Sequence, residues 1–167
     1  MRELLKTCGP TSPFPADLLY KSLGIEQKLD EAEIDRILEY GYQGRYTKLV
    51  LSLLYPDRDW KDAIFHEDHI FPKSEFQLRA LKKRGYNEAK IQAYMSNFNI
   101  LTNPQLLTDS ENLSKNATPF DKWIQTRDAA FIKRHLIPDS IKLDFDSFDE
   151  FSKARRILIV ESLKALT

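Results

Sequence analysis

The sequence is poor in the residues and segments that characterise secreted or membrane-embedded proteins. It contains one cysteine, Cys8, which excludes an internal disulfide framework and a multi-cysteine zinc site. No apolar run approaches the roughly 20 residues of a membrane span. Arg2, Glu3 and Lys6 interrupt any apolar segment that could serve as a signal peptide. These features predict a cytoplasmic protein with no membrane partner.

Glycine and net charge are also scarce. The chain has five glycines, and it contains no glycine-rich phosphate loop, no GxSxG elbow and no CxxC pair. Its 25 basic and 25 acidic residues give a formal net charge of zero, which counts against an extended nucleic-acid-binding surface. A local basic face is still compatible with this balance, because basic residues concentrate in residues 79–90 and acidic residues in residues 139–150.

The length and the apolar pattern predict one mostly helical α+β domain. At 167 residues and 42% hydrophobic content, the chain is long enough to bury a core. Apolar spacing and capping signals predict helices within residues 17–23, 30–41, 74–84, 87–94, 109–115, 120–136 and 147–166. Residues 46–55 are strongly apolar and predict either a helix or a buried segment. In the last helix, we expect the core face to consist of Phe151, Ile157, Leu158, Val160 and Leu163.

One stretch mixes polar and apolar residues in a way that predicts a functional site. Residues 65–74 read Phe-His-Glu-Asp-His-Ile-Phe-Pro-Lys-Ser, with two histidines and two carboxylates between apolar neighbours. Polar side chains within an apolar strand are costly unless a metal, a phosphate or solvent compensates them. We therefore expect a short strand, stopped by Pro72, that delivers Asp68 and His69 to a site.

Asp68 and His69 are the residues best suited to chemistry on a phosphate. An aspartate oxygen can hold a hard cation such as Mg²⁺, and a neutral imidazole can accept a proton from water. Because side chains alternate along a strand, the two residues serve one site only if the backbone turns there. The helix expected over residues 109–115 places Asn112 and Lys115 on one face, where they could supply an oxygen for a metal and a cation for phosphate.

A second strand is predicted between these two segments. Residues 97–104 contain Phe98, Ile100 and Leu101 among three asparagines, and they end at Pro104. This pattern indicates a strand that enters a loop. The segments would then form a small strand, strand and helix unit within a helical domain.

This combination resembles the ββα-metal (HNH) nuclease motif. Asp68-His-Ile-Phe-Pro-Lys-Ser74 resembles the DHI-x-P-x-S line of HNH nucleases. Asn99-Ile-Leu-Thr, followed by Asn112-Leu-Ser-Lys-Asn-Ala-Thr-Pro-Phe120, resembles the C-terminal HNH module of GmrSD-type modification-dependent restriction proteins. Two later stretches, 135–138 and 148–155, resemble the tail of that module, so the resemblance covers most of residues 45–165.

The resemblance implies a DNA endonuclease of a restriction or antiviral defence system. It implies a divalent metal, Mg²⁺ first and Mn²⁺ second, products with 5′ phosphates, and a ParB-like nucleotide-hydrolysing domain as an N-terminal partner. We expect a single domain over residues 1–167, divided into a helical N-terminal part (1–60), an HNH core with a helical insertion (61–123, insertion 75–95) and C-terminal helices (124–167).

The resemblance also implies a role for individual residues. His69 matches the general base, and Asp68 and Asn112 match the metal ligands. Lys115 matches a basic position near the scissile phosphate. Asn99 matches the middle asparagine, which is structural and ties down the loop after the first strand.

Several basic residues have two readings on the sequence alone. His66 and Lys73 are candidates for phosphate contact, although a solvent-facing histidine is as good a reading of His66. The basic cluster in residues 79–84 is either a DNA-facing surface or a solvated helix face. Arg155 and Arg156 either support the site or pair with the acidic stretch over residues 144–150.

Two other functions remain open at this point. The first is an HNH-like domain that binds DNA or a partner protein without cutting, which the neutral net charge favours. The second is a nuclease directed at RNA. The joint presence of Asp68, His69 and Asn112 favours a nuclease over the non-cleaving domain, because a degenerate module would have lost one of the three. Parallel RNA and DNA substrates would distinguish the second alternative.

Overall fold

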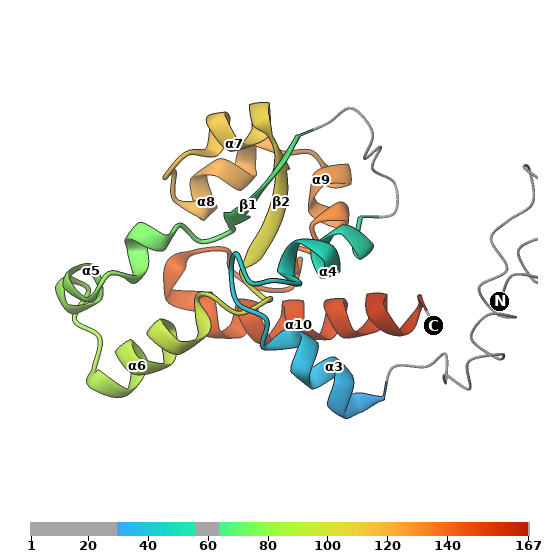
Figure 1. Ribbon diagram of the computed structural model, residues 1–167. Helices are drawn as coiled ribbons and strands as arrows, with labels where there is room; N and C mark the ends of the chain where they lie inside the picture. Colours follow the sequence, from blue (N-terminus) through green and yellow to red (C-terminus); the bar gives the residue numbers. More distant parts are fainter. Residues whose placement is uncertain (1–29, 56–63, 167) are drawn as a thin grey trace, which may run out of the picture.

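The computed structural model describes residues 30–55 and 64–166. Cys8 and the helix expected over residues 17–23 lie outside these described residues. Within them, the chain is mostly helical and has one two-stranded antiparallel sheet (Figure 1). The predicted α+β class is therefore confirmed, while the embedded HNH motif stays a prediction.

The described elements place the sheet between helices that precede it, interrupt it and follow it. In chain order they are α3 (Glu31–Leu38), α4 (Thr47–Leu53), β1 (Phe65–His69), η1 (Lys73–Phe76), α5 (Leu78–Lys83), α6 (Glu88–Asn97), β2 (Pro104–Thr108), α7 (Asp109–Lys115), α8 (Phe120–Trp123), η2 (Ile124–Thr126), α9 (Ala129–Arg134), η3 (Phe145–Ser147) and α10 (Phe148–Lys164).

Side-chain caps fix the start of several helices. Asp30 caps α3 and forms the predicted capping box with Glu33, and Asn87 caps α6 as expected. Helix α7 begins at Asp109, the first residue of its expected range, and the side chain of Thr108 caps it. Gly85 follows α5 with φ of 76°, the left-handed conformation that glycine adopts at low cost after a helix.

The first strand forms where it was predicted, but the second does not. Strand β1 pairs antiparallel with β2, with His69 opposite Pro104. Our prediction of a strand over residues 97–104 was wrong, because Asn97 still belongs to α6 and residues 98–103 form a turn. Proline is tolerated as the first residue of a strand, so Pro104 begins β2 and does not end it.

Two long predicted helices are divided in the structure. The helix expected over residues 74–84 becomes η1 and α5, separated by the extended residue Gln77. The helix expected over residues 120–136 becomes α8, η2 and α9. The break in the second follows from Asp128, whose side chain accepts the Phe131 N–H at 2.8 Å and so starts a new helix.

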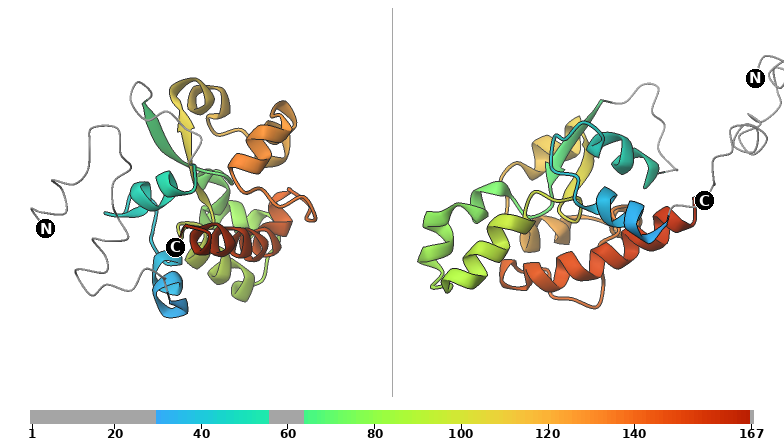
Figure 2. Two further views of the ribbon diagram at one scale, coloured as in Figure 1. Left: turned by 90° about the vertical axis from the view of Figure 1, so that its right-hand side faces the viewer. Right: turned by 60° about the horizontal axis from the view of Figure 1, so that its bottom comes forward.

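Two clusters of buried side chains form the core, and α10 contributes to both. Phe148 and Phe151 join an aromatic cluster, whereas Ile159 and Leu163 join an aliphatic one. Helix α10 runs along one side of the molecule, with α6 near its start and α3 near its end (Figures 1 and 2). The expected core position Ile157 is 59% exposed, because the buried stripe of α10 passes through Ile159.

Within residues 30–55 and 64–166, no helix has both the length and the apolar character that crossing a bilayer requires.

Candidate active site

A cleft of about 380 Å³ runs along β1. Four consecutive β1 residues line it, and successive side chains of a strand point to opposite faces, so the cleft must lie along the edge of β1 that does not pair with β2. Helix α7 closes one side, and the segment before α4 closes the other. The lining residues are Tyr42, Gln43, Lys48, Phe65, His66, Glu67, Asp68 and Asn112.

Asp68 presents one carboxylate oxygen to the protein. Its Oδ2 accepts hydrogen bonds from Lys115 Nζ at 2.9 Å and from Gln105 Nε2 at 3.1 Å. Its Oδ1 has no hydrogen-bond partner among the described residues, and the side chain is 17% exposed. This arrangement orients the carboxylate while leaving one oxygen available to a ligand in the cleft.

Lys115 lies beneath the site. Its side chain is fully buried, and Nζ donates to the His69 carbonyl at 2.6 Å as well as to Asp68. Burial lowers the pKa of Lys115, and the adjacent Asp68 carboxylate opposes that shift. The placement differs from the expected contact with a scissile phosphate, because a side chain without exposed surface does not reach a substrate in the cleft.

His69 is a nearly buried imidazole held in one orientation. It is 5% exposed, and its Nε2 bonds Asn99 Oδ1 at 2.8 Å. Since an amide oxygen accepts, Nε2 carries the hydrogen and Nδ1 keeps the free lone pair. No hydrogen-bond partner faces Nδ1 among the described residues. Burial lowers the pKa of His69, so the ring is neutral at neutral pH and can accept a proton.

The asparagines divide their roles differently from the sequence prediction. Asn99 was expected to tie down the loop after the first strand, but its side chain bonds the imidazole of His69. The loop is tied by Asn103, whose Oδ1 accepts the Phe71 N–H at 2.9 Å and whose Nδ2 donates to the Phe71 carbonyl at 3.2 Å. Asn103 is fully buried and was missed by sequence reasoning.

The structure brings Asn112 and Asp68 to one cleft. Asn112 comes from α7 and Asp68 from β1. Among the described residues, no cluster of three or more histidine, cysteine or acidic side chains could hold a metal ion. Two oxygen ligands nevertheless suit Mg²⁺, which keeps several waters and binds through one or two protein oxygens. The donor set therefore fits a hard, hydrated cation and does not fit zinc.

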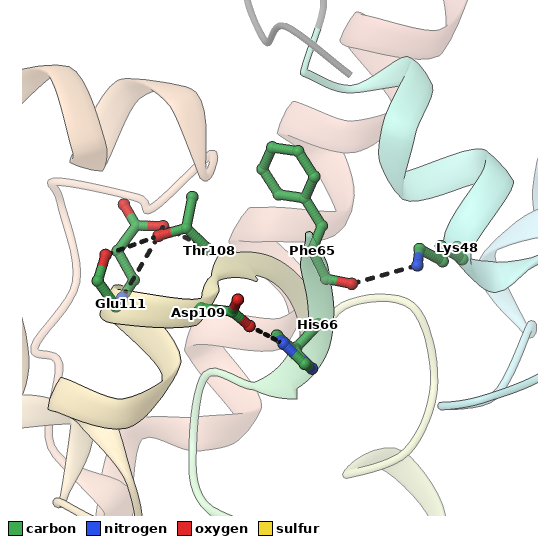
Figure 3. A network of polar contacts seen from close by, with 7 residues as sticks. Lys48, Phe65, His66, Thr108, Asp109 and Glu111 are labelled. Carbon is green, nitrogen blue, oxygen red and sulfur yellow. Dashed lines mark hydrogen bonds and ion pairs between the residues drawn. The ribbon is translucent and has the colours of Figure 1, made fainter. Parts of the chain in front are cut away.

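His66 and Lys48 also line the cleft, and Lys73 lies near His69. Figure 3 shows His66 Nε2 facing Asp109 Oδ1 of α7, with which it forms a hydrogen bond. The same view shows Lys48 reaching from α4 to the Phe65 carbonyl, which it meets at 3.2 Å. Lys73 is exposed and close enough to His69 for its charge to lower the pKa of that ring. These groups make the cleft mouth polar.

Tyr42 and Gln43 are further site residues that sequence reasoning missed. The Tyr42 ring lies 4.0 Å from the His69 ring, and the Gln43 N–H donates to Glu67 Oε2 at 2.7 Å. Only the two glycines at 41 and 44 signalled a turn in this segment, and nothing local connected it to residues far along the chain.

Comparison with known proteins gives no family assignment, because no protein-family model and no curated protein matches the chain.

Proposed function

We propose that this chain is a metal-dependent endonuclease of HNH type that hydrolyses DNA, with the cleft beside β1 as its active site. The observation that carries the proposal is that Asp68 and Asn112 line one cleft. His69 follows Asp68 in β1 but does not itself line this cleft, and its ring contacts the lining residue Tyr42. A divalent cation can stabilise the charge that develops on phosphate oxygens, and a neutral imidazole can accept the proton of the attacking water.

Each residue of the site has a defined task in this reaction. Asp68 and Asn112 would hold a divalent cation, which when bound supplies Lewis-acid stabilisation of the charge on the leaving oxygen. His69 Nδ1 takes a proton from the water that attacks phosphorus. Asn99 keeps Nε2 protonated and so reserves Nδ1 for that transfer. As the pKa of His69 is lowered, this base stays neutral at neutral pH.

The distribution of cations supports a polyanionic substrate. Lys48 and Lys73 lie at the cleft and near His69. Further along the chain, α5 carries three exposed cations at i, i+3 and i+4 on one face: Arg79, Lys82 and Lys83. This face lies opposite the buried Leu81, so a phosphate backbone leaving the cleft could follow it.

Arg84, the residue that follows α5, differs from these three cations. It pairs with Glu75 at 2.7 Å and lies over the Phe145 ring, with 4.4 Å from its guanidinium carbon to the ring centroid. Arg84 therefore fixes the end of α5 to Glu75 and Phe145, whereas Arg79, Lys82 and Lys83 have no partner among the described residues. This division between one paired cation and three unpaired ones favours a DNA-facing surface over a solvated helix face.

The alternative is a non-cleaving domain that binds DNA or a partner protein. One observation favours it: the Asp68 carboxylate is already paired with the ammonium of Lys115. A pre-neutralised carboxylate binds a cation less tightly than a free one. The restriction or defence setting and the ParB-like partner domain remain proposals that rest on the sequence resemblance alone, and a cytoplasmic location remains a proposal that rests on composition.

The test is nicking of supercoiled plasmid, both plain and base-modified, with Mg²⁺ or Mn²⁺ and with EDTA. We expect cation-dependent nicking that His69→Ala lowers by roughly 10²- to 10⁴-fold. Gln92→Ala, at an exposed position of α6, is the control and should leave the rate unchanged.

Three outcomes separate the readings. Nicking that survives His69→Ala would remove the mechanism proposed for this site. DNA binding without any cation-dependent cleavage by the wild type would favour the non-cleaving alternative. Cleavage of an RNA substrate in preference to DNA would redirect the proposal to RNA.

A further inference from the structure

We infer that Tyr42 is a positioning residue that holds the His69 imidazole in its proton-accepting orientation. This inference rests on the proposed function, since it concerns how the base of that reaction is held. Tyr42 belongs to the segment between α3 and α4, more than 20 residues before β1 in the chain.

The first support is direct contact between the two rings. The Tyr42 and His69 ring centroids are 4.0 Å apart, with planes inclined at 34°. The Phe98 ring lies 5.8 Å from the same imidazole at an angle of 25°. Offset contacts of this kind favour a particular ring orientation beyond the area that they bury.

The second support is that Tyr42 also holds the partner of the imidazole. Its backbone N–H donates to the Asn99 carbonyl at 2.7 Å, and the Asn99 side chain accepts from His69 Nε2. One residue thus touches the ring and fixes the backbone of the residue that sets the tautomer. A displacement of Tyr42 would disturb both at once.

The segment that carries Tyr42 has little freedom to move. Gly41 forms a β-bridge with Ile100, and its carbonyl accepts the Thr47 hydroxyl at 2.5 Å. Gln43 adopts φ of 57°, a conformation that is uncommon outside glycine, and its N–H is bonded to Glu67. A Cβ at Gly44 would lie 2.7 Å from the Gly41 oxygen, so the turn requires glycine.

The Tyr42 hydroxyl secures the ring from its far end. It donates to the Glu67 carbonyl at 3.2 Å. Burial, followed by the charges of Asp68 and Glu67, raises the pKa of Tyr42, so the hydroxyl keeps its proton at neutral pH. Tyr42 is therefore a donor and a ring surface, and proton transfer stays with His69.

The experiment compares Tyr42→Leu, which removes the ring, with Tyr42→Phe, which removes only the hydroxyl. We expect Tyr42→Leu to lower kcat roughly 10- to 100-fold with little change in KM, because misplacing a catalytic group affects the chemical step. Tyr42→Phe should keep most of kcat. Tyr46→Leu is the control, since Tyr46 is 44% exposed and has no contact with His69.

A second measurement does not depend on cleavage. The Tyr42 ring current should displace the NMR signals of the His69 ring protons, and the displacement should vanish in Tyr42→Leu but persist in Tyr42→Phe and Tyr46→Leu. Should Tyr42→Leu not fold, Tyr42→Met replaces it, because a flexible thioether fills the space without a ring.

The outcomes are distinguishable from a failure of the proposed function. The inference would be overturned if the His69 signals of Tyr42→Leu were the same as those of the wild type. It would also be overturned if those signals differed from the wild type while kcat stayed unchanged. If the wild type cleaves no nucleic acid, the nuclease proposal fails and takes the catalytic part of the inference with it, and the NMR comparison then reports only whether the ring contact exists.

Discussion

Two buried cations, Lys115 under the cleft and Arg155 under the start of β2, stabilise the two-stranded sheet in contrasting ways. Both side chains are fully buried, and both donate to backbone carbonyls. Lys115 bonds the carbonyl of His69 at 2.6 Å. Arg155 bonds the carbonyls of Thr102 and Pro104, each at 2.9 Å, and the carbonyl of His135 at 3.1 Å.

The difference lies in the counter-charge. Lys115 is balanced by Asp68 in the cleft, whereas Arg155 has no carboxylate partner among the described residues. Burial lowers the pKa of Arg155 to about 10, which still leaves the guanidinium charged at neutral pH. We conclude that Arg155 serves the fold alone, while Lys115 links the fold to the charge of the candidate site.

Replacing Arg155 should have the largest effect on stability. Arg155→Met would leave three backbone carbonyls buried without their donor, and each such loss costs roughly 1 to 3 kcal/mol. We expect the free energy of unfolding in urea to fall by at least about 3 kcal/mol. A divalent cation should stabilise Arg155→Met no more than the wild type, since Arg155 does not touch the cleft, so the deficit relative to the wild type should persist.

The adjacent arginine provides a matched control. Arg156 pairs with Asp35 at 2.6 Å, and both side chains are at least one-third exposed. Arg156→Met should therefore cost less than about 1 kcal/mol. Equal losses for the two variants would show that burial of the guanidinium is not what distinguishes Arg155.

Replacing Lys115 should have a smaller effect that cations can offset. Lys115→Met leaves the Asp68 carboxylate without its ammonium partner, and we expect a loss of about 2 to 3 kcal/mol because Asp68 retains some solvent contact. The unpaired carboxylate should bind Mg²⁺ or Mn²⁺ more tightly than in the wild type. Thermal denaturation with and without Mn²⁺ measures both effects, since a bound ligand raises the melting temperature.

The comparison between the two cations fails if Mn²⁺ raises the melting temperature of Arg155→Met as much as that of Lys115→Met. In that case Lys115 would not weaken cation binding at Asp68, and the proposed link between Lys115 and the charge of the site would be lost.

Acid should produce the smallest of these effects on stability. It should act through His69, whose carbonyl Lys115 bonds, and not through Arg155. The pKa of His69 is lowered by burial, so the unfolded chain binds a proton there more readily than the folded one. The His69 contribution to stability is therefore complete above pH 6.5, the ordinary histidine pKa, and declines as the pH falls below it. Denaturation midpoints between pH 5 and 8 for His69→Gln and the wild type measure this contribution. In His66→Gln, stability should still fall as the pH drops below 6.5. If stability falls by the same amount in His69→Gln, another titrating group is responsible for the loss.

Local signals account for what the sequence predicted correctly. A run of polar residues between apolar neighbours, stopped by Pro72, indicated β1, and the Asp30 and Asn87 caps indicated the starts of α3 and α6. Asp68 and Asn112 were selected from residue type and both line the cleft beside β1, and their role as metal ligands stays a prediction.

What could not be predicted depends on contacts between distant segments. Asn99 and Asn103 lie in one short turn, and only its path decides which amide reaches the imidazole and which reaches Phe71. The burial of Lys115 has no sequence signal, because a lysine on a polar helix is normally exposed. Tyr42 approaches His69 from another segment entirely.

The unpaired edge of β1 has a consequence for how the molecule behaves at high concentration. Three alternate carbonyls, at Phe65, Glu67 and His69, are each occupied by a side chain: Lys48, Tyr42 and Lys115 respectively. An exposed strand edge invites another chain to add a strand, and occupied acceptors remove the template for that pairing. The side chains that shape the cleft therefore also guard the protein against edge-to-edge aggregation.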